Sequence, residues 1–301
     1  MNRRSFVKSA TSFAALGSAH AAGPFVRPEG PRLRLGLAAY SFRNYFHISR
    51  GRPSTLPEEQ QIGMHEFIDF CAAQGCDGAE LTSYFFDENV TDEALINVRR
   101  HAFLRGVDVS GTAVGNNFTH PKGAERDQQM TYVKKWIDRA AILGAPHIRV
   151  FAGKHGKELP ADEAWANVVE NLRTAGDYAA TKGIFLGIEN HDSVGDHETL
   201  LKLVRDADHP WVGVNLDSGN FRTADPYLDI EATAPYAVNV QVKVEFKREG
   251  AAEQEETDLE RLITILKAAN YQGYVILEYE ANDNPYEAIP PLMKRLSELC
   301  A

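Results

Sequence analysis

Cysteine is scarce in this chain, and its few cysteines do not form a recognisable motif. Among 301 residues there are three, Cys71, Cys76 and Cys300. An odd number without closely spaced pairs matches neither a zinc ribbon nor a disulfide framework. At most one bridge could form, and nothing in the sequence requires it.

Long apolar runs are also absent. The weakly apolar, alanine-rich stretch near the N-terminus is too short to span a membrane as a mature helix. It follows Arg3 and Arg4 in a segment that resembles the twin-arginine export motif, and it precedes Ala19-His20-Ala21, which has the small-x-small form of a cleavage site. We therefore predict a twin-arginine signal peptide over residues 1–21, a linker over residues 22–31, and a periplasmic or secreted protein.

Basic residues are fewer than acidic ones, 32 against 42. Loss of residues 1–21 would remove Arg3, Arg4 and Lys8 but no acidic residue, which changes the formal charge from −10 to −13. Such a surface repels phosphate backbones. The composition therefore argues against nucleic acid or an anionic membrane as the partner and favours a small molecule. A homo-oligomer remains possible.

The remaining pattern is a regular alternation of short apolar runs and longer segments of helical periodicity. Eight predicted strands, each followed by a helix and spaced about 27 to 40 residues apart, fit a (β/α)8 TIM barrel better than an open sheet. No glycine-rich phosphate loop follows the first strand, which removes the main reason to expect a dinucleotide-binding fold. We predict one α/β domain over residues 32–301.

Three of the predicted strands end in a carboxylate. Glu189, Asp217 and Glu278 follow the apolar runs that begin at residues 184, 211 and 274. The active site of such a barrel lies at the carboxyl ends of its strands. Carboxylates crowded there would repel one another unless a cation lay between them, and oxygen ligands suit Mg²⁺ or Mn²⁺. Alternatively, each acid caps a helix or pairs with a basic side chain.

These motifs make the chain resemble the xylose-isomerase-like barrel family of sugar isomerases, ketose 3-epimerases and related dehydratases. The resemblance implies a divalent metal, Mn²⁺ or Mg²⁺ in the first place and Co²⁺ or Zn²⁺ as alternatives. It assigns Glu189, Asp217 and Glu278 to that metal, with Glu189 and Glu278 also serving as the acid and base. Lys243 matches the family lysine that steadies negative charge on the substrate oxygen.

The seventh strand departs from the family pattern. Gln241 stands where the family commonly has a histidine ligand. A glutamine still offers an amide oxygen to a hard cation, although it is a neutral and weaker donor. Gln241 is therefore the predicted fourth ligand. The substitution also suggests an alternative, a non-catalytic saccharide-binding protein with the same barrel fold.

Other polar residues at the same predicted face are candidate substrate-binding groups. Each has a structural alternative. The His191 imidazole could bond a loop carbonyl, and Glu80 could form an ion pair with Arg149 or Lys243. An arginine inside a strand needs a polar place, and the barrel mouth provides one. The candidates are His191, Arg149, Glu80, Asn220 and Tyr40.

The resemblance implies a metal-dependent isomerase or epimerase that acts on a free sugar or keto-sugar through an enediolate. Expulsion of a β-substituent from the same intermediate would make the protein a lyase or dehydratase, for example on a 3-keto-glycoside. A non-catalytic periplasmic saccharide-binding protein is the third possibility. The related abasic-site endonuclease activity is disfavoured by the acidic charge.

Overall fold

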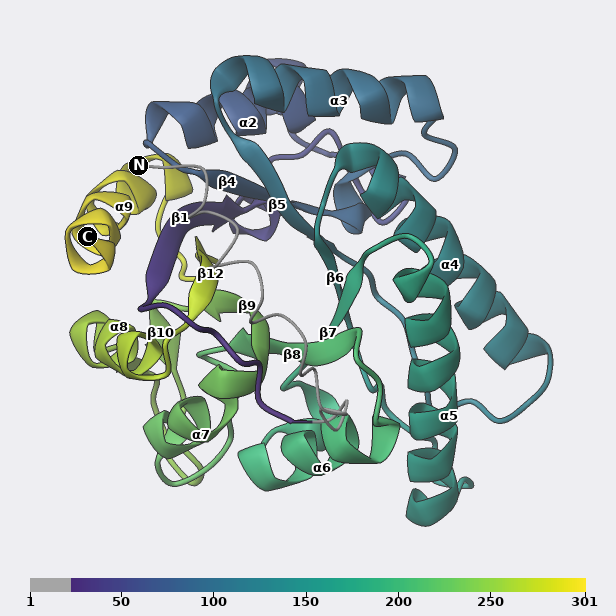
Figure 1. Ribbon diagram of the computed structural model, residues 1–301. Helices are drawn as coiled ribbons and strands as arrows, with labels where there is room; N and C mark the ends of the chain where they lie inside the picture. Colours follow the sequence, from purple (N-terminus) through teal and green to yellow (C-terminus); the bar gives the residue numbers. More distant parts are fainter. Residues whose placement is uncertain (1–22) are drawn as a thin grey trace, which may run out of the picture.

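The structure is a computed structural model that describes residues 23–301, so the predicted signal peptide lies outside the described residues. Within that range, eight parallel strands close into a barrel surrounded by helices (Figure 1). This confirms the predicted TIM barrel. Around the barrel, in spatial order, the strands are β1 (Arg32–Ala38), β12 (Gln272–Leu277), β9 (Ala237–Val242), β8 (Val212–Asp217), β7 (Phe185–Glu189), β6 (His147–Val150), β5 (Asp108–Ala113) and β4 (Gly78–Thr82).

The helices form the outer layer and bury one apolar face against the strands, as in α6 (His197–Ala207), where Leu200, Leu203 and Val204 are buried. Side chains at the N-caps start several of them: Thr91, for example, accepts from the backbone N–H of Ala94 at 3.2 Å. Among residues 23–301, no helix is both long and apolar enough to cross a membrane. The helices are α2 (Met64–Ala73), α3 (Asp92–Arg105), α4 (Ala124–Leu143), α5 (Ala161–Ala180), α6 (His197–Ala207), α7 (Pro226–Thr233), α8 (Leu259–Ala268) and α9 (Pro285–Cys300).

Three pieces of secondary structure were not predicted from the sequence. Helix α7 begins at Asp225-Pro226, an N-cap followed by proline at the first helical position, which is a recognisable start signal. Short strands β10 (Glu245–Phe246) and β11 (Glu255–Glu256) pair as an antiparallel hairpin. Both residues of β11 are exposed acids. Short strands β2 (Ile48–Ser49) and β3 (Arg52–Pro53) form a second hairpin.

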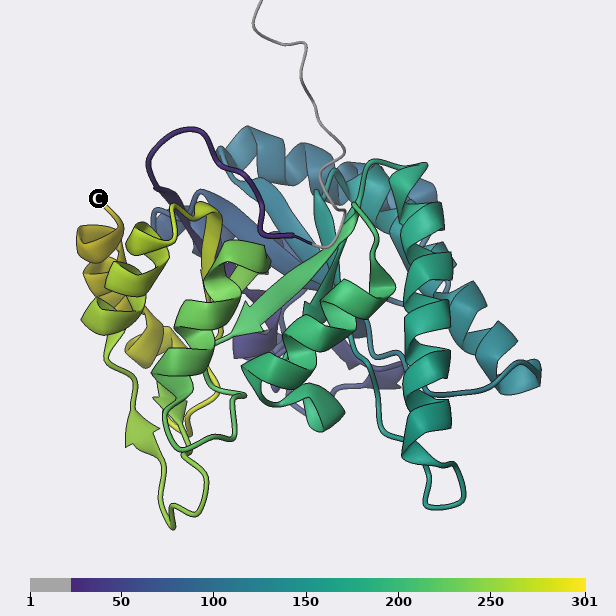
Figure 2. The same cartoon turned by 60° about the horizontal axis from the view of Figure 1, so that its bottom comes forward.

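Part of the segment predicted as a linker packs against the barrel. The ring of Phe25 meets Phe185 edge-on at 5.7 Å, and the Arg27 side chain donates to the carbonyl of Ala237 at 2.6 Å. Both partners stand at the beginnings of their strands. Figure 2 shows this dark purple arm across one end of the barrel and the β10–β11 hairpin projecting from the other. The arm thus covers the amino end of the barrel and leaves the carboxyl end free.

Alternate residues of neighbouring strands place polar side chains at the centre of the barrel. Asn215 and Asp217 share one face of β8, and Asn239 and Gln241 share one face of β9. All four side chains are buried. Asn215 and Asn239 pair across the two strands deeper in the barrel, and Asp217 and Gln241 pair nearer its carboxyl end. Strand periodicity therefore sorts the polar residues into layers, of which the upper one forms the candidate site.

Replacing Gly36 with alanine should weaken the barrel, because strands β1 and β4 approach closely there. A Cβ atom on Gly36 would lie 2.8 Å from the carbonyl oxygen of Gly78 and would also collide with the Ile276 side chain. Overpacking of this kind costs about 1–3 kcal/mol. Denaturant unfolding should show a lower midpoint for Gly36→Ala. Gly30→Ala, whose Cβ would meet nothing within 4 Å, is the matched control, and equal midpoints for the two variants would contradict this account.

Candidate active site

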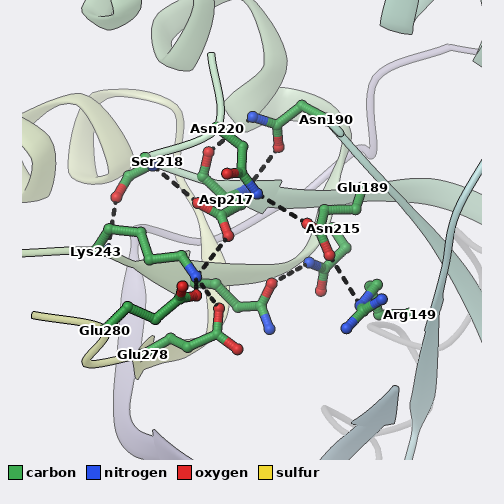
Figure 3. Close-up of polar contacts among 12 residues, drawn as sticks. Arg149, Glu189, Asn190, Asn215, Asp217, Ser218, Asn220, Lys243, Glu278 and Glu280 are labelled. Atoms are coloured by element: carbon green, nitrogen blue, oxygen red, sulfur yellow. Dashed lines mark hydrogen bonds and ion pairs between the residues drawn. The ribbon is translucent and has the colours of Figure 1, made fainter. Parts of the chain in front are cut away.

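The carboxyl ends of five strands bring the predicted acidic and basic residues into one buried group. Glu189 and Asp217 end β7 and β8, and Arg149 lies in β6. Lys243 and Glu278 follow β9 and β12 directly. All five side chains are buried (Figure 3). Residues separated by up to 129 positions in sequence thus share one small volume, as the strand-end pattern predicted.

The centre of this group is the ammonium of Lys243. It contacts carboxylate oxygens of Glu278 and Glu280 and lies 3.2 Å from Oδ2 of Asp217 (Figure 3). Burial alone would lower the pKa of Lys243, but the three acids outweigh it and raise that pKa well above its usual value. The ammonium is therefore charged at neutral pH. It donates hydrogen bonds to Glu278 and Glu280 and forms an ion pair with Asp217.

A second ion pair holds Glu189. Arg149 Nε lies 2.8 Å from Oε2 of Glu189, and Asn220 donates to the other carboxylate oxygen at 2.9 Å. Burial raises the pKa of Glu189, the charge of Arg149 opposes that rise, and the negative charge of Glu278 adds to it. Glu189 and Glu278 are thus close enough to influence each other, and each has its own cationic partner.

Asp217 is fixed by its own chain and its neighbours. Its Oδ1 accepts from the backbone N–H of Gly219 at 2.8 Å, and the Asn190 side chain brackets its backbone with bonds of 2.7 and 2.8 Å. Burial raises the pKa of Asp217 to about 6, although Lys243 opposes the rise. At neutral pH it is mostly ionised, and it presents Oδ2 towards Lys243.

The side chain of Gln241 is directed towards the deeper layer and is used differently from the prediction. Its Oε1 accepts from Asn215 at 2.6 Å, and its Nε2 donates to Glu80 at 2.8 Å. Asn239 donates to the other oxygen of Glu80 at 2.8 Å. Both polar atoms of the glutamine amide are therefore committed to a hydrogen-bonded network, and its oxygen is not presented beside the carboxylates.

Glu80 also differs from the predicted alternatives, because it pairs directly with neither Arg149 nor Lys243. It is fully buried beneath them, with the imidazole of His147 4.0 Å away. Burial, with a contribution from Glu278, raises the pKa of Glu80 to about 8, and burial lowers the pKa of His147 to about 4. At neutral pH the acid is mostly protonated and the imidazole neutral, so this deeper layer adds little charge.

The donors as arranged do not fit the predicted divalent metal. Among residues 23–301, no three His, Cys, Asp or Glu side chains are grouped so that they could hold an ion. The predicted ligands Asp217 and Glu278 instead converge on the Lys243 ammonium, Glu189 is bonded to Arg149, and the amide oxygen of Gln241 is taken. The four predicted ligands are neighbours, but their oxygens serve other partners.

Two other predicted substrate-binding residues lie at the rim. Half-exposed His191 packs against the Phe151 ring at 4.8 Å and has Nδ1 3.0 Å from Asp192. Tyr40 packs near Tyr84, and burial raises its pKa, with smaller contributions from Glu280 and Glu278. Neither residue belongs to the central charge cluster, so their binding role stays a prediction.

Sequence reasoning missed Glu280 and the amides of the deeper layer. Glu280 stands two residues after Glu278, and Asn215 and Asn239 stand two residues before Asp217 and Gln241. The period of two along a strand was the signal that could have found all three. Glu280 matters most, because its side chain is 41% exposed while it contacts the ammonium, whereas that of Glu278 is 6% exposed.

Two cavities open near this group. A small one of about 130 Å³ touches Lys243, Glu280 and Asn220 directly. A larger one of about 670 Å³ lies to the side and is lined by Tyr84, which neighbours Arg149, and by the rings of Tyr132 and Trp136. The small cavity adjoins the charged groups, and the large one offers space for further parts of a ligand.

A closed parallel barrel with buried acids and bases at the carboxyl ends of its strands defines a TIM-barrel enzyme. Residues 68–299 match the family model for the xylose isomerase-like TIM barrel, and the chain belongs to that family. This confirms the resemblance seen in the sequence. No curated protein matches the sequence.

Solved structures with the same fold include several epimerases. A D-psicose 3-epimerase crystallised with D-fructose is 18% identical, with a TM-score of 0.66 over 87% of this chain and 89% of that one. The 3-keto-D-glucoside 4-epimerase of E. coli is 18% identical, with a TM-score of 0.63 over 89% and 100%. An IolI protein crystallised with a zinc atom is 14% identical, with a TM-score of 0.70 over 88% and 96%. At these identities the likeness is one of fold.

The Arg149–Glu189 pair can be tested by a double-mutant cycle. Arg149→Met leaves the Glu189 carboxylate buried without its cation, which costs about 3–5 kcal/mol of unfolding free energy. Adding Glu189→Gln removes the stranded charge and should recover much of that loss. Denaturant unfolding of the two single variants and the double variant gives the coupling energy. Additive losses would show that the two side chains are not paired.

Proposed function

We propose that this protein is an isomerase or epimerase of a free sugar or keto-sugar that works through an enediolate. The observation that carries the proposal is the pair of buried carboxylates, Glu189 and Glu278, held at the carboxyl ends of β7 and β12 in one barrel mouth with a cation beside each. Membership of the xylose isomerase-like family and the epimerases among its structural neighbours support the same class of reaction.

In the proposed reaction, one carboxylate removes the proton from the carbon next to the substrate carbonyl. The electron pair of the broken C–H bond forms the carbon–carbon double bond, and the carbonyl electrons move onto oxygen. Return of a proton to the other face of the same carbon, by the second carboxyl group, gives the epimer. Return to the adjacent carbon, with movement of the hydroxyl proton, gives the isomer. Glu189 and Glu278 have these two roles.

Lys243 and Arg149 would stabilise the negative charge that develops on the substrate oxygen. Lys243 is ion-paired with Asp217, Glu278 and Glu280, and of these acids Glu280 is the most exposed. A substrate oxygen entering from the small cavity would therefore replace Glu280 at the ammonium. A fixed cation at the position where charge develops lowers the barrier without reorganisation of solvent.

The donors described above do not fit the Mn²⁺ or Mg²⁺ ion that the sequence predicts, nor Co²⁺ or Zn²⁺ in the same position. The steps proposed here therefore use only the side chains of the chain. Export by the predicted twin-arginine signal, if it occurs, would direct the protein to free sugars and keto-sugars outside the cytoplasm and away from sugar phosphates. The acidic charge of the chain is consistent with a neutral sugar substrate.

A lyase acting on a 3-keto-glycoside is the second candidate. The cavity of about 670 Å³ lined by Tyr84, a neighbour of Arg149, favours it, because that space could hold the part of a glycoside that leaves. The enediolate would then expel the β-substituent as an alcohol when that oxygen receives a proton, instead of regaining the proton on carbon. Formation of an α,β-unsaturated ketone would identify this reaction.

The proposal predicts exchange of a carbon-bound proton. Incubation with ketoses and 3-keto-glucosides in deuterated water should place deuterium next to the carbonyl, as followed by NMR. Glu189→Gln and Glu278→Gln should each slow the exchange about 10²–10⁴-fold, because each removes a general acid or base. The exposed Glu253→Gln is the matched control and should exchange as the wild type does.

Circular dichroism should show that each glutamine variant is folded before its rate is compared. Exchange at the wild-type rate in both variants would refute the assigned roles. Saturable sugar binding by the wild type without exchange, epimerisation or elimination would instead establish the saccharide-binding alternative.

A further inference from the structure

We propose that the Lys243 ammonium is the resident cation of this site, so that the chain operates without a divalent metal ion. The resemblance to the family predicts a metal between Asp217 and Glu278. In this chain, the Lys243 ammonium already contacts both carboxylates. It therefore supplies, from within the sequence, the positive charge that the crowded acids require.

The lysine is held in that position along its whole length. Its backbone N–H donates to the Ser218 hydroxyl at 2.9 Å, and its aliphatic stem lies directly over Gly219, where a Cβ would come within 2.7 Å of the Lys243 Cβ. The residue is only 8% exposed. A metal could enter between the carboxylates only if this packed side chain left, and its ammonium would then need three new acceptors.

The predicted fourth ligand is not available to a metal. Gln241 would have to break its bonds with Asn215 and Glu80 to turn its oxygen upward. That movement would leave buried polar groups unpaired, which is unfavourable. Two features therefore disfavour a divalent metal. With glutamine in place of histidine the site lacks a ligand, and with the ammonium at its centre it already contains a cation.

Charge repulsion gives the same result. A divalent ion placed a few ångströms from the ammonium would be repelled by it, because both carry positive charge. The other anionic partner, Glu189, is already neutralised by Arg149. The remaining acid, Glu280, is the exposed member that can be exchanged for a substrate oxygen.

This inference rests on the proposed function only for the statement that Lys243 faces the enediolate oxygen. The claim that Lys243 takes the place of a divalent metal is tested by metal binding, without any measurement of turnover. The full mature chain is treated with a chelator, the chelator is removed, and free Mn²⁺ is titrated with electron paramagnetic resonance as the readout. The wild type should bind no stoichiometric Mn²⁺ at concentrations around 100 μM.

Lys243→Met should gain a Mn²⁺ site, because three carboxylates lose their cation while the hydrophobic stem is kept. Its affinity should exceed that of the wild type by about 100-fold or more. Lys243→Met combined with Gln241→His should bind more tightly again, because it restores the family's donor set. Two matched controls should resemble the wild type: Lys157→Met, which removes an exposed lysine, and Glu280→Gln, which keeps the ammonium in place.

One Mn²⁺ per wild-type chain with micromolar affinity would overturn the inference, and so would a folded Lys243→Met that gains no affinity. If Lys243→Met does not fold, the wild-type titration still decides the question. Proton exchange that continues unchanged in excess chelator would support the inference. Exchange that stops with chelator and returns with Mn²⁺ would refute it while leaving the proposed reaction intact, whereas an absence of exchange in all conditions would refute only the reaction.

Discussion

Neutralisation of buried carboxylates is the physical constraint on which this site depends. Glu189, Asp217 and Glu278 lie at three strand ends with almost no exposure, and like charges so arranged repel unless cations lie among them. Arg149 and Lys243 meet that requirement, one beside Glu189 and the other between Asp217 and Glu278. The positions of these two cations therefore determine how the acidic side chains of the barrel mouth are oriented.

The deeper layer of the barrel explains how the upper layer is positioned. An amide network joins Asn215, Asn239 and Gln241 to Glu80, so that polar side chains fill a place where many barrels have apolar ones. The network gives Gln241 a structural role. This amide is directed downward, and the ammonium of Lys243, which directly follows β9, lies beside Asp217 and Glu278.

Much of this arrangement could be predicted from the sequence. Continuous apolar runs ending in an acid located Glu189, Asp217 and Glu278, and the alternation of strands and helices identified the barrel. The partner of each side chain could not be predicted, because strand period places a residue on a face but does not say which atom it will meet. Gln241 was therefore expected beside a metal, and Glu280 was overlooked although it repeats the spacing of Glu278. The clearest miss outside the site, helix α7, was a short segment whose only signal was Asp225-Pro226.

The most direct test of the central claim is a crystal structure of the protein grown with millimolar MnCl₂, with anomalous diffraction measured for manganese. The account predicts no anomalous peak between Asp217 and Glu278, with the Lys243 ammonium within hydrogen-bond distance of both carboxylates. A strong peak at that position, with Lys243 turned away and the Gln241 oxygen facing the ion, would contradict it.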